Sequence, residues 1–160
     1  MEIRISSKEI LFNIKNKSHQ EVAVLLPDPE QRYTQEASSE KEEDIKRCIL
    51  EAYSEAVGIL SRFEYNICPR QEASAGAPNT GIVLPEYFMF FIESSERRIV
   101  SEEQALADLL LSYMTNRSLS RFYTNAGRSD LAAKDEANAA TDKDSIVKII
   151  YRKRRPSLPL

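Results

Sequence analysis

The sequence has few of the residues on which glycine-rich, metal-binding and disulfide-stabilised domains depend. Its 160 residues include four glycines, two cysteines and one histidine, and there is no tryptophan. The glycines at 58, 76, 81 and 127 are scattered, which excludes a glycine-rich phosphate-binding loop. Cys48 and Cys68 form no CxxC pair, which argues against a zinc site and a disulfide framework. We therefore expect no metal and no cofactor, and so few glycines favour helices over a turn-rich β fold.

Neither cysteine belongs to a recognisable catalytic pattern. A cysteine nucleophile needs a partner base, and His19 is the sole histidine. The stretch "NKSHQE" around His19 is polar and predicts a solvated loop, whereas Cys48 lies in a helical pattern typical of a core residue. Cys68, in "YNICPR", could be more exposed. A Cys–His pair stays open, but nothing around either residue supports it.

Acid–base chemistry is the catalytic alternative that composition leaves open. The chain has 25 acidic residues, but no spacing or apolar setting marks a carboxylate pair. A deep pocket lined by acids with perturbed pKa values would reveal such a site. Because no carboxylate pair is marked in the sequence, we expect neither an enzyme nor a small-molecule substrate.

Long hydrophobic runs are also missing. No apolar run approaches the roughly 20 residues that span a bilayer, and "MEIRISSKEILF" has no apolar signal segment. We therefore expect the protein to be synthesised in the cytosol and not to associate with a membrane. A length of 160 residues with 42% apolar content predicts one domain with a small core. We place this domain at 1–155, with an exposed loop at about 64–82 and a tail at 156–160.

Helical periodicity dominates the pattern of the chain. The strongest signal is the helix expected over 40–63, whose apolar positions step by 4, 3, 4, 4 and 3: Ile45, Ile49, Ala52, Ala56, Leu60 and Phe63. A second helix is expected from Ser101, with a buried face formed by Leu106, Leu110, Tyr113, Leu119, Phe122, Tyr123 and Ala126. Gly127 should end it. A last helix follows Ser129, with Ala133, Ala137, Ala140, Val147 and Tyr151 on its buried face.

The remaining segments predict short strands and loops. "EIRI" at 2–5 alternates as a strand does, and "YFMFFIES" at 87–94 predicts a buried strand, with a subunit contact surface as the alternative. The segment 6–17 fits a short helix or a continuation of the strand, and 25–39 reads as a loop. The expected fold is mainly α (α+β), a small bundle of about three long helices with a short N-terminal strand and a small central β element.

The basic end of the chain is the feature that points to a partner. Five cations follow Asp144 with no acid after them, in a chain of net charge −3: Lys148, Arg152, Lys153, Arg154 and Arg155. One or two of them would suffice for the C-terminus of a helix. The rest could contact phosphates, or dock on an acidic protein surface such as the start of the 40–63 helix in another copy. The acidic remainder of the chain disfavours a stand-alone nucleic-acid binder.

The order of these segments resembles that of the small head–tail connector (adaptor or head-completion) proteins of tailed phages and prophages, as found in phages of gut Bacteroidetes. The resemblance lies in "EIRI", "EKEEDIKRCILEAYSEAVGILSRF", "YFMFFIES", "SLSRFYTNAGRSDLAAK" and the basic-proline ending "IYRKRRPSLP". It covers nearly the whole chain but includes no catalytic signature. The last helix, with "KDEANAATDKDS", is more polar than this family pattern.

This resemblance implies a non-enzymatic virion protein. Its partners would be copies of itself in a ring, the portal and the tail proteins, near packaged DNA. It would be found in the virion, and in the cytoplasm of the bacterial host during assembly. The alternative is a small nucleic-acid-binding or regulatory module that uses the basic cluster.

Overall fold

The computed structural model describes residues 2–25, 28, 37, 41–61, 81–92 and 103–151. Within these ranges the protein is mainly helical, with one two-stranded antiparallel sheet. The elements in chain order are β1 (Glu2–Ser6), α1 (Ser7–Leu25), α3 (Glu42–Ser61), β2 (Tyr87–Phe91), α4 (Glu103–Asn125) and α5 (Ser129–Tyr151). The predicted fold class is therefore confirmed. The loop expected at 64–82 lies outside the described residues except for 81 and 82.

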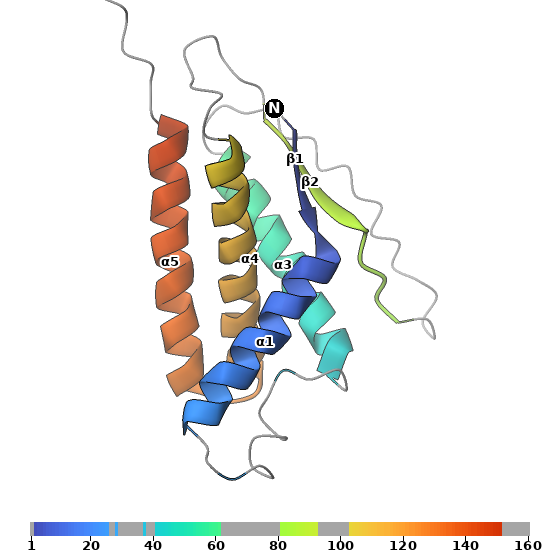
Figure 1. Ribbon diagram of the computed structural model, residues 1–160, viewed down its shortest axis with the longest axis vertical. Coiled ribbons are helices and arrows are strands. Elements are labelled where there is room, and N and C mark those ends of the chain that lie inside the picture. The colour runs from blue at the N-terminus through green and yellow to red at the C-terminus, as the bar shows by residue number, and fades with distance from the viewer. Residues whose placement is uncertain are drawn as a thin grey trace, which may run out of the picture.

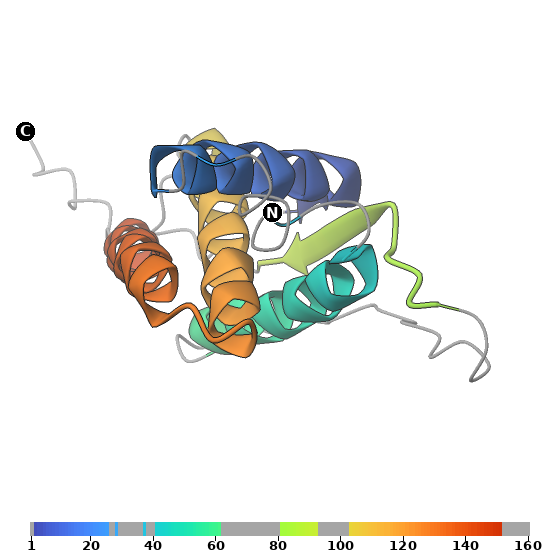
Figure 2. The ribbon, with the colours of Figure 1, turned by 90° about the horizontal axis from the view of Figure 1, so that it is seen from below.

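Helix α4 is the centre of the bundle. It packs against α5 on one side and α3 on another, and α1 crosses over it (Figures 1 and 2). The sheet lies on the far side of the bundle from α5 (Figure 2). Because α4 has neighbours on several sides, its buried residues include polar ones such as Thr115, Asn116 and Ser118. Its expected apolar face is buried as predicted up to Tyr123, but Ala126 is exposed in the turn that follows.

The sheet joins the N-terminal strand to a segment more than 80 residues away. The register pairs Ile3 with Phe90 and Ile5 with Phe88, and these four side chains are buried. Glu2 and Arg4 alternate with them and face solvent, as expected of a half-buried strand. Both predicted strands are thus confirmed, and together they form a single sheet.

Helix α3 covers the inner face of the sheet through an aromatic cluster. The ring of Tyr53 lies 4.9 Å from that of Phe88 and 5.2 Å from that of Phe90. The Tyr53 hydroxyl donates a hydrogen bond to the Met89 carbonyl oxygen at 2.8 Å. The predicted apolar stripe of α3 is buried from Ile45 to Leu60, and Phe63 lies outside the described residues.

Helix α1 is longer than the sequence pattern predicted. A short helix or strand over 6–17 was expected, but the helix continues to Leu25. Its inward stripe changes character halfway: Ile10 and Ile14 are buried, and so are Ser18 and Glu21 on the next two turns. The apolar periodicity therefore stops while the helix does not. The loop predicted around His19 is wrong, because His19 belongs to α1, whereas its predicted exposure to solvent is confirmed.

A glycine turn reverses the chain between α4 and α5. Gly127 has a φ of 76°, a left-handed conformation that glycine adopts without strain. The Arg128 amide donates to the Tyr123 carbonyl at 2.8 Å and the Gly127 amide to the Thr124 carbonyl at 3.1 Å. These are the two hydrogen bonds of a Schellman cap, so the predicted end of α4 is confirmed.

The buried face of α5 differs from the one that the sequence predicted. Ala133, Ala137 and Ala140 are exposed. The helix is rotated so that another stripe meets α4 and α1: Leu131, Asp135, Ala139, Ile146 and Ile150. This stripe includes the fully buried Asp135. A prediction from hydrophobic periodicity places an aspartate on the exposed face, so it could not find this stripe. The prediction for Tyr151 falls on a side chain that the structure does not describe.

Candidate functional site

The predicted docking cluster is described only at its first member. Lys148 is exposed on the last turns of α5. Arg152, Lys153, Arg154 and Arg155 lie outside the described residues. Their role in docking therefore stays a prediction.

The acidic first turn of α3 lies at the other end of the bundle. Glu42 Oε2 lies 3.5 Å from Lys15 Nζ, and Glu42 Oε1 lies 3.8 Å from Lys46 Nζ. The Ile82 amide donates a hydrogen bond to Glu43 Oε2 at 2.8 Å. Asp44 is exposed. Glu43 thus fastens the segment before β2 to α3, while Glu42 and Asp44 present negative charge at the surface.

The structure brings together a second group of charges that sequence reasoning missed. Glu21 on α1 and Asp135 on α5 meet inside the bundle, with only 7% and 0% of their surfaces exposed. Lys17, one turn before Glu21 on α1, approaches both of them. Its Nζ lies 2.9 Å from Asp135 Oδ1 and 3.7 Å from Glu21 Oε1. Two buried carboxyl groups therefore share one ammonium group.

The charges of this buried cluster balance only if one carboxyl group holds a proton. Two carboxylates and one ammonium group sum to −1, a costly net charge for the interior of a protein. All four carboxylate oxygens are buried, and apart from the ion pairs with Lys17 they have no hydrogen-bond partner among the described residues. A proton on Glu21 supplies a donor to Asp135 and brings the sum to zero.

The pKa of Glu21 reflects this environment. The pKa is raised from 4.5 to about 7, first by burial and then by the hydrogen bond and the charge of Asp135. Lys17 and Lys134 act in the opposite direction. Burial also raises the pKa of the nearby Tyr123 hydroxyl, which stays protonated. Such a shift is typical of carboxyl groups that share a proton.

Further hydrogen bonds surround the buried cluster. The Tyr123 hydroxyl donates to Ser18 Oγ at 2.8 Å, and Ser18 Oγ accepts the Ala37 amide at 2.8 Å. On the other side, Lys17 donates to Asn116 Oδ1, and Asn116 Nδ2 donates to Asp142 Oδ2 at 2.8 Å. These contacts orient Lys17 from α4 and α5.

Two shallow grooves flank the cluster. One, of about 460 Å³, lies between α1 and α5 and is lined by Lys17, Gln20, Glu21, Val24, Asp130, Leu131 and Lys134. The other, of about 370 Å³, lies between α1 and α4 and is lined mainly by amide and hydroxyl side chains. Glu21 lines the first groove, whereas Asp135 lines neither. A single perturbed acid at a groove is a weaker arrangement for acid–base catalysis than a convergent pair.

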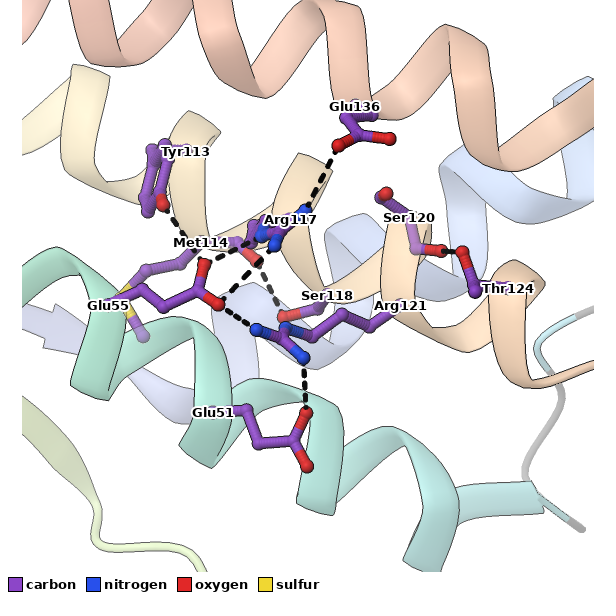
Figure 3. A network of polar contacts seen from close by, with 10 residues as sticks. All are labelled: Glu51, Glu55, Tyr113, Met114, Arg117, Ser118, Ser120, Arg121, Thr124 and Glu136. Atoms are coloured by element: carbon purple, nitrogen blue, oxygen red, sulfur yellow. Dashed lines mark hydrogen bonds and ion pairs between the residues drawn. The ribbon is translucent and has the colours of Figure 1, made fainter. Parts of the chain in front are cut away.

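A contrasting ion-pair network joins α3 to α4 near the surface (Figure 3). Arg117 Nε lies 2.6 Å from Glu55 Oε2, and Arg121 Nη1 lies 3.0 Å from Glu51 Oε2. Arg121 also contacts Glu55, and Tyr113 donates to Glu55 Oε2 at 3.3 Å. Arg117 also approaches the exposed Glu136, with Nη1 3.8 Å from Oε1. Each glutamate here has an arginine partner and is partly exposed, so the groups can all be ionised without a shared proton.

The other candidate residues give no sign of chemistry. Cys48 is buried, and burial raises the pKa of its thiol to about 11, which opposes a nucleophilic role. Cys68 lies outside the described residues. Within the described ranges, no three His, Cys, Asp or Glu side chains gather as metal ligands would. Nor is any described helix both long and apolar enough to cross a membrane.

One signal in the sequence could have located the buried pair. Glu21 follows Ser7, Ile10, Ile14 and Ser18 at helical spacing, and Asp135 stands four residues after Leu131 and four before Ala139. Continuing each stripe through its polar member would have placed both acids inside. Their proximity to each other depends on tertiary packing, which no spacing in the sequence encodes.

The chain was compared with protein-family models, with curated proteins and with solved structures, and none of the three comparisons found a match.

Proposed function

We propose that the protein is a non-catalytic structural subunit of a phage or prophage head–tail connector, assembled as a ring of copies between portal and tail. Virions, and the host cytoplasm during assembly, would be its location. The support is the sequence resemblance together with one feature of the bundle. That feature is the separation of its acidic and basic ends.

The two ends are far apart along the long axis of the molecule. The first turn of α3, with Glu42 and Asp44, lies near one end, and the last turn of α5, which follows Lys148, lies at the opposite end (Figure 1). The cations at 152–155 follow directly in the sequence. Acidic and basic groups so separated are poorly placed to neutralise one another within one bundle.

This polarity favours head-to-tail contact between copies. A basic end that docks on the acidic end of the next copy makes a heterologous contact, and repetition of that contact closes a ring when the rotation permits. Charge complementarity of this kind fixes orientation and speeds encounter. The portal and tail proteins would then contact the two faces of the ring.

Sedimentation velocity at low salt, over a range of protein concentrations, tests this proposal. We expect a discrete oligomer for the wild type and a monomer when Arg152, Lys153, Arg154 and Arg155 are changed to glutamate. Reversing Glu42 and Asp44 to lysine should also give a monomer. Both reversals in one chain should restore the oligomer, because the complementarity returns with opposite signs.

The control variant replaces exposed cations elsewhere, Lys8, Arg47 and Lys143, by glutamine, and it should assemble as the wild type does. An oligomer that survives the tail reversal would contradict the proposal. So would a wild-type monomer at every concentration. A monomer that binds a random-sequence DNA duplex and is released by salt would instead favour the nucleic-acid-binding module.

A further inference from the structure

The buried carboxyl pair has a consequence for how α1 is held in the bundle. Glu21 and Asp135 are separated by 114 positions in the chain, yet they meet where the C-terminal half of α1 crosses α5. Their meeting brings together four buried oxygens, for which the described residues supply Lys17 as the ion-pair partner. A proton between the two carboxyl groups supplies the further donor. In the C-terminal half of α1, the buried residues are Ser18, Glu21 and Val22, so the carboxyl pair is a large part of what holds this half.

We propose that one proton shared by Glu21 and Asp135 fastens the C-terminal half of α1 to α5, and that loss of this proton releases that half as a conformational switch. The inference rests on the described bundle alone and is independent of the connector function.

The charged neighbours of the pair set the direction of the switch. From α1, Lys17 faces both acids, and its side chain is 28% exposed. From α5, Lys134 is exposed and contributes only a weak attraction, while Asp130 at the groove adds negative charge. From α4, the titratable group is Tyr123, which stays neutral. Once the proton departs, one partly buried ammonium group, that of Lys17, is left against two buried carboxylates.

Release would open the groove that Glu21 lines. Repulsion between two buried carboxylates drives Glu21 toward water, and the groove between Val24 and Leu131 is the nearest exit. Val22, fully buried beside Glu21, would be exposed with it. The pKa of Glu21, at about 7, places the change near neutral pH, with the closed form on the acidic side.

Amide hydrogen exchange on the full-length protein tests the switch. After correction for the intrinsic pH dependence of exchange, we expect the amides of residues 18–24 to lose at least tenfold in protection between pH 6 and pH 8.5. The amides of α3 should keep theirs. The variant Glu21→Gln, an isostere of the protonated acid, should keep full protection at both values. Glu9→Gln, an exposed change on the same helix, should behave as the wild type does.

A second variant, Asp135→Asn, tests the same proposal in case Glu21→Gln does not fold. Asp135→Asn leaves one carboxylate beside Lys17 and should abolish the pH-dependent loss of protection. Equal protection of residues 18–24 at both pH values in the wild type would overturn the proposal. A pH-dependent loss that persists in whichever of the two variants folds would also overturn it.

Discussion

Two helix interfaces of the bundle, α3–α4 and α1–α5, accommodate charged side chains in opposite ways. Between α3 and α4, Arg117 and Arg121 face Glu51 and Glu55 close to water (Figure 3). Where α1 meets α5, a single lysine serves two buried carboxyl groups. The groups of the first interface can all be ionised because each acid is partly exposed and has an arginine partner. The second is neutral only when a proton is bound.

The comparison teaches that an ion pair must be judged by its charge balance and its burial together. Exposed pairs contribute little because water solvates the separated charges nearly as well. A buried carboxylate has no such alternative, so it takes up a proton at a pH where exposed carboxylates stay ionised. The α1–α5 interface should therefore be sensitive to pH, and the α3–α4 interface to salt.

The largest effect should follow from removal of Lys17, the partly buried cation that serves both buried carboxyl groups. Lys17→Met leaves Glu21 and Asp135 without their ammonium partner, and at pH 8 we expect it to lower the free energy of unfolding by about 3 to 5 kcal/mol. Urea unfolding followed by circular dichroism measures this. The control is Lys8→Met on the exposed face of α1. A loss below about 1 kcal/mol would show that the cluster is solvated and not truly buried.

A gain in stability should follow from removal of the excess negative charge. The pKa of Glu21 is raised on folding from 4.5 to about 7, so the folded state binds more protons than the unfolded state between these values. Stability contributed by the bound proton is therefore lost as pH rises through about 7. Glu21→Gln removes this dependence. Its effect on the free energy of unfolding, taken as mutant minus wild type, should be more favourable at pH 8 than at pH 5 by about 2 to 3 kcal/mol. A uniform effect at both pH values would contradict a shared proton.

The smallest effect is expected at the matched interface. Glu51→Gln removes one partner of Arg121, but the Glu51 side chain is 45% exposed and Glu55 still contacts Arg121. We expect a loss of about 0.2 to 1 kcal/mol that shrinks in 1 M salt and is the same at pH 5 and pH 8. Thermal unfolding at two salt concentrations measures it. A large pH-dependent loss would remove the distinction between the two interfaces.

Periodicity predicted those elements whose buried stripe is apolar throughout. The α3 stripe from Ile45 to Leu60 and the alternation of Ile3 and Ile5 identified a helix and a strand. The pattern failed where a polar residue occupies an inward position. The predicted end of α1 came too early, before Ser18. The predicted buried face of α5 held alanines that are exposed and left out Asp135, which is buried.

The candidate site lay where that pattern failed. Glu21 directly precedes the apolar run "VAVLL" at 22–26, an apolar setting that sequence reasoning missed, but no spacing along the chain pairs Glu21 with Asp135. Their burial comes from packing between helices that are distant in sequence. The stretch "KDEANAATDKDS" is more polar than the pattern of the resembled family. One of its acids, Asp135, faces the core of the bundle.

The shared proton is the central claim, and direct titration of the Glu21 carboxyl group tests it most directly. Carbon-13 NMR of the full-length protein, with Glu21 assigned by comparison with Glu21→Gln, follows that carboxyl carbon from pH 4 to pH 9. The account predicts a midpoint near 7, which Asp135→Asn should lower. A midpoint near the ordinary 4.5 in the wild type would mean that both acids are ionised inside the bundle, and it would contradict the account.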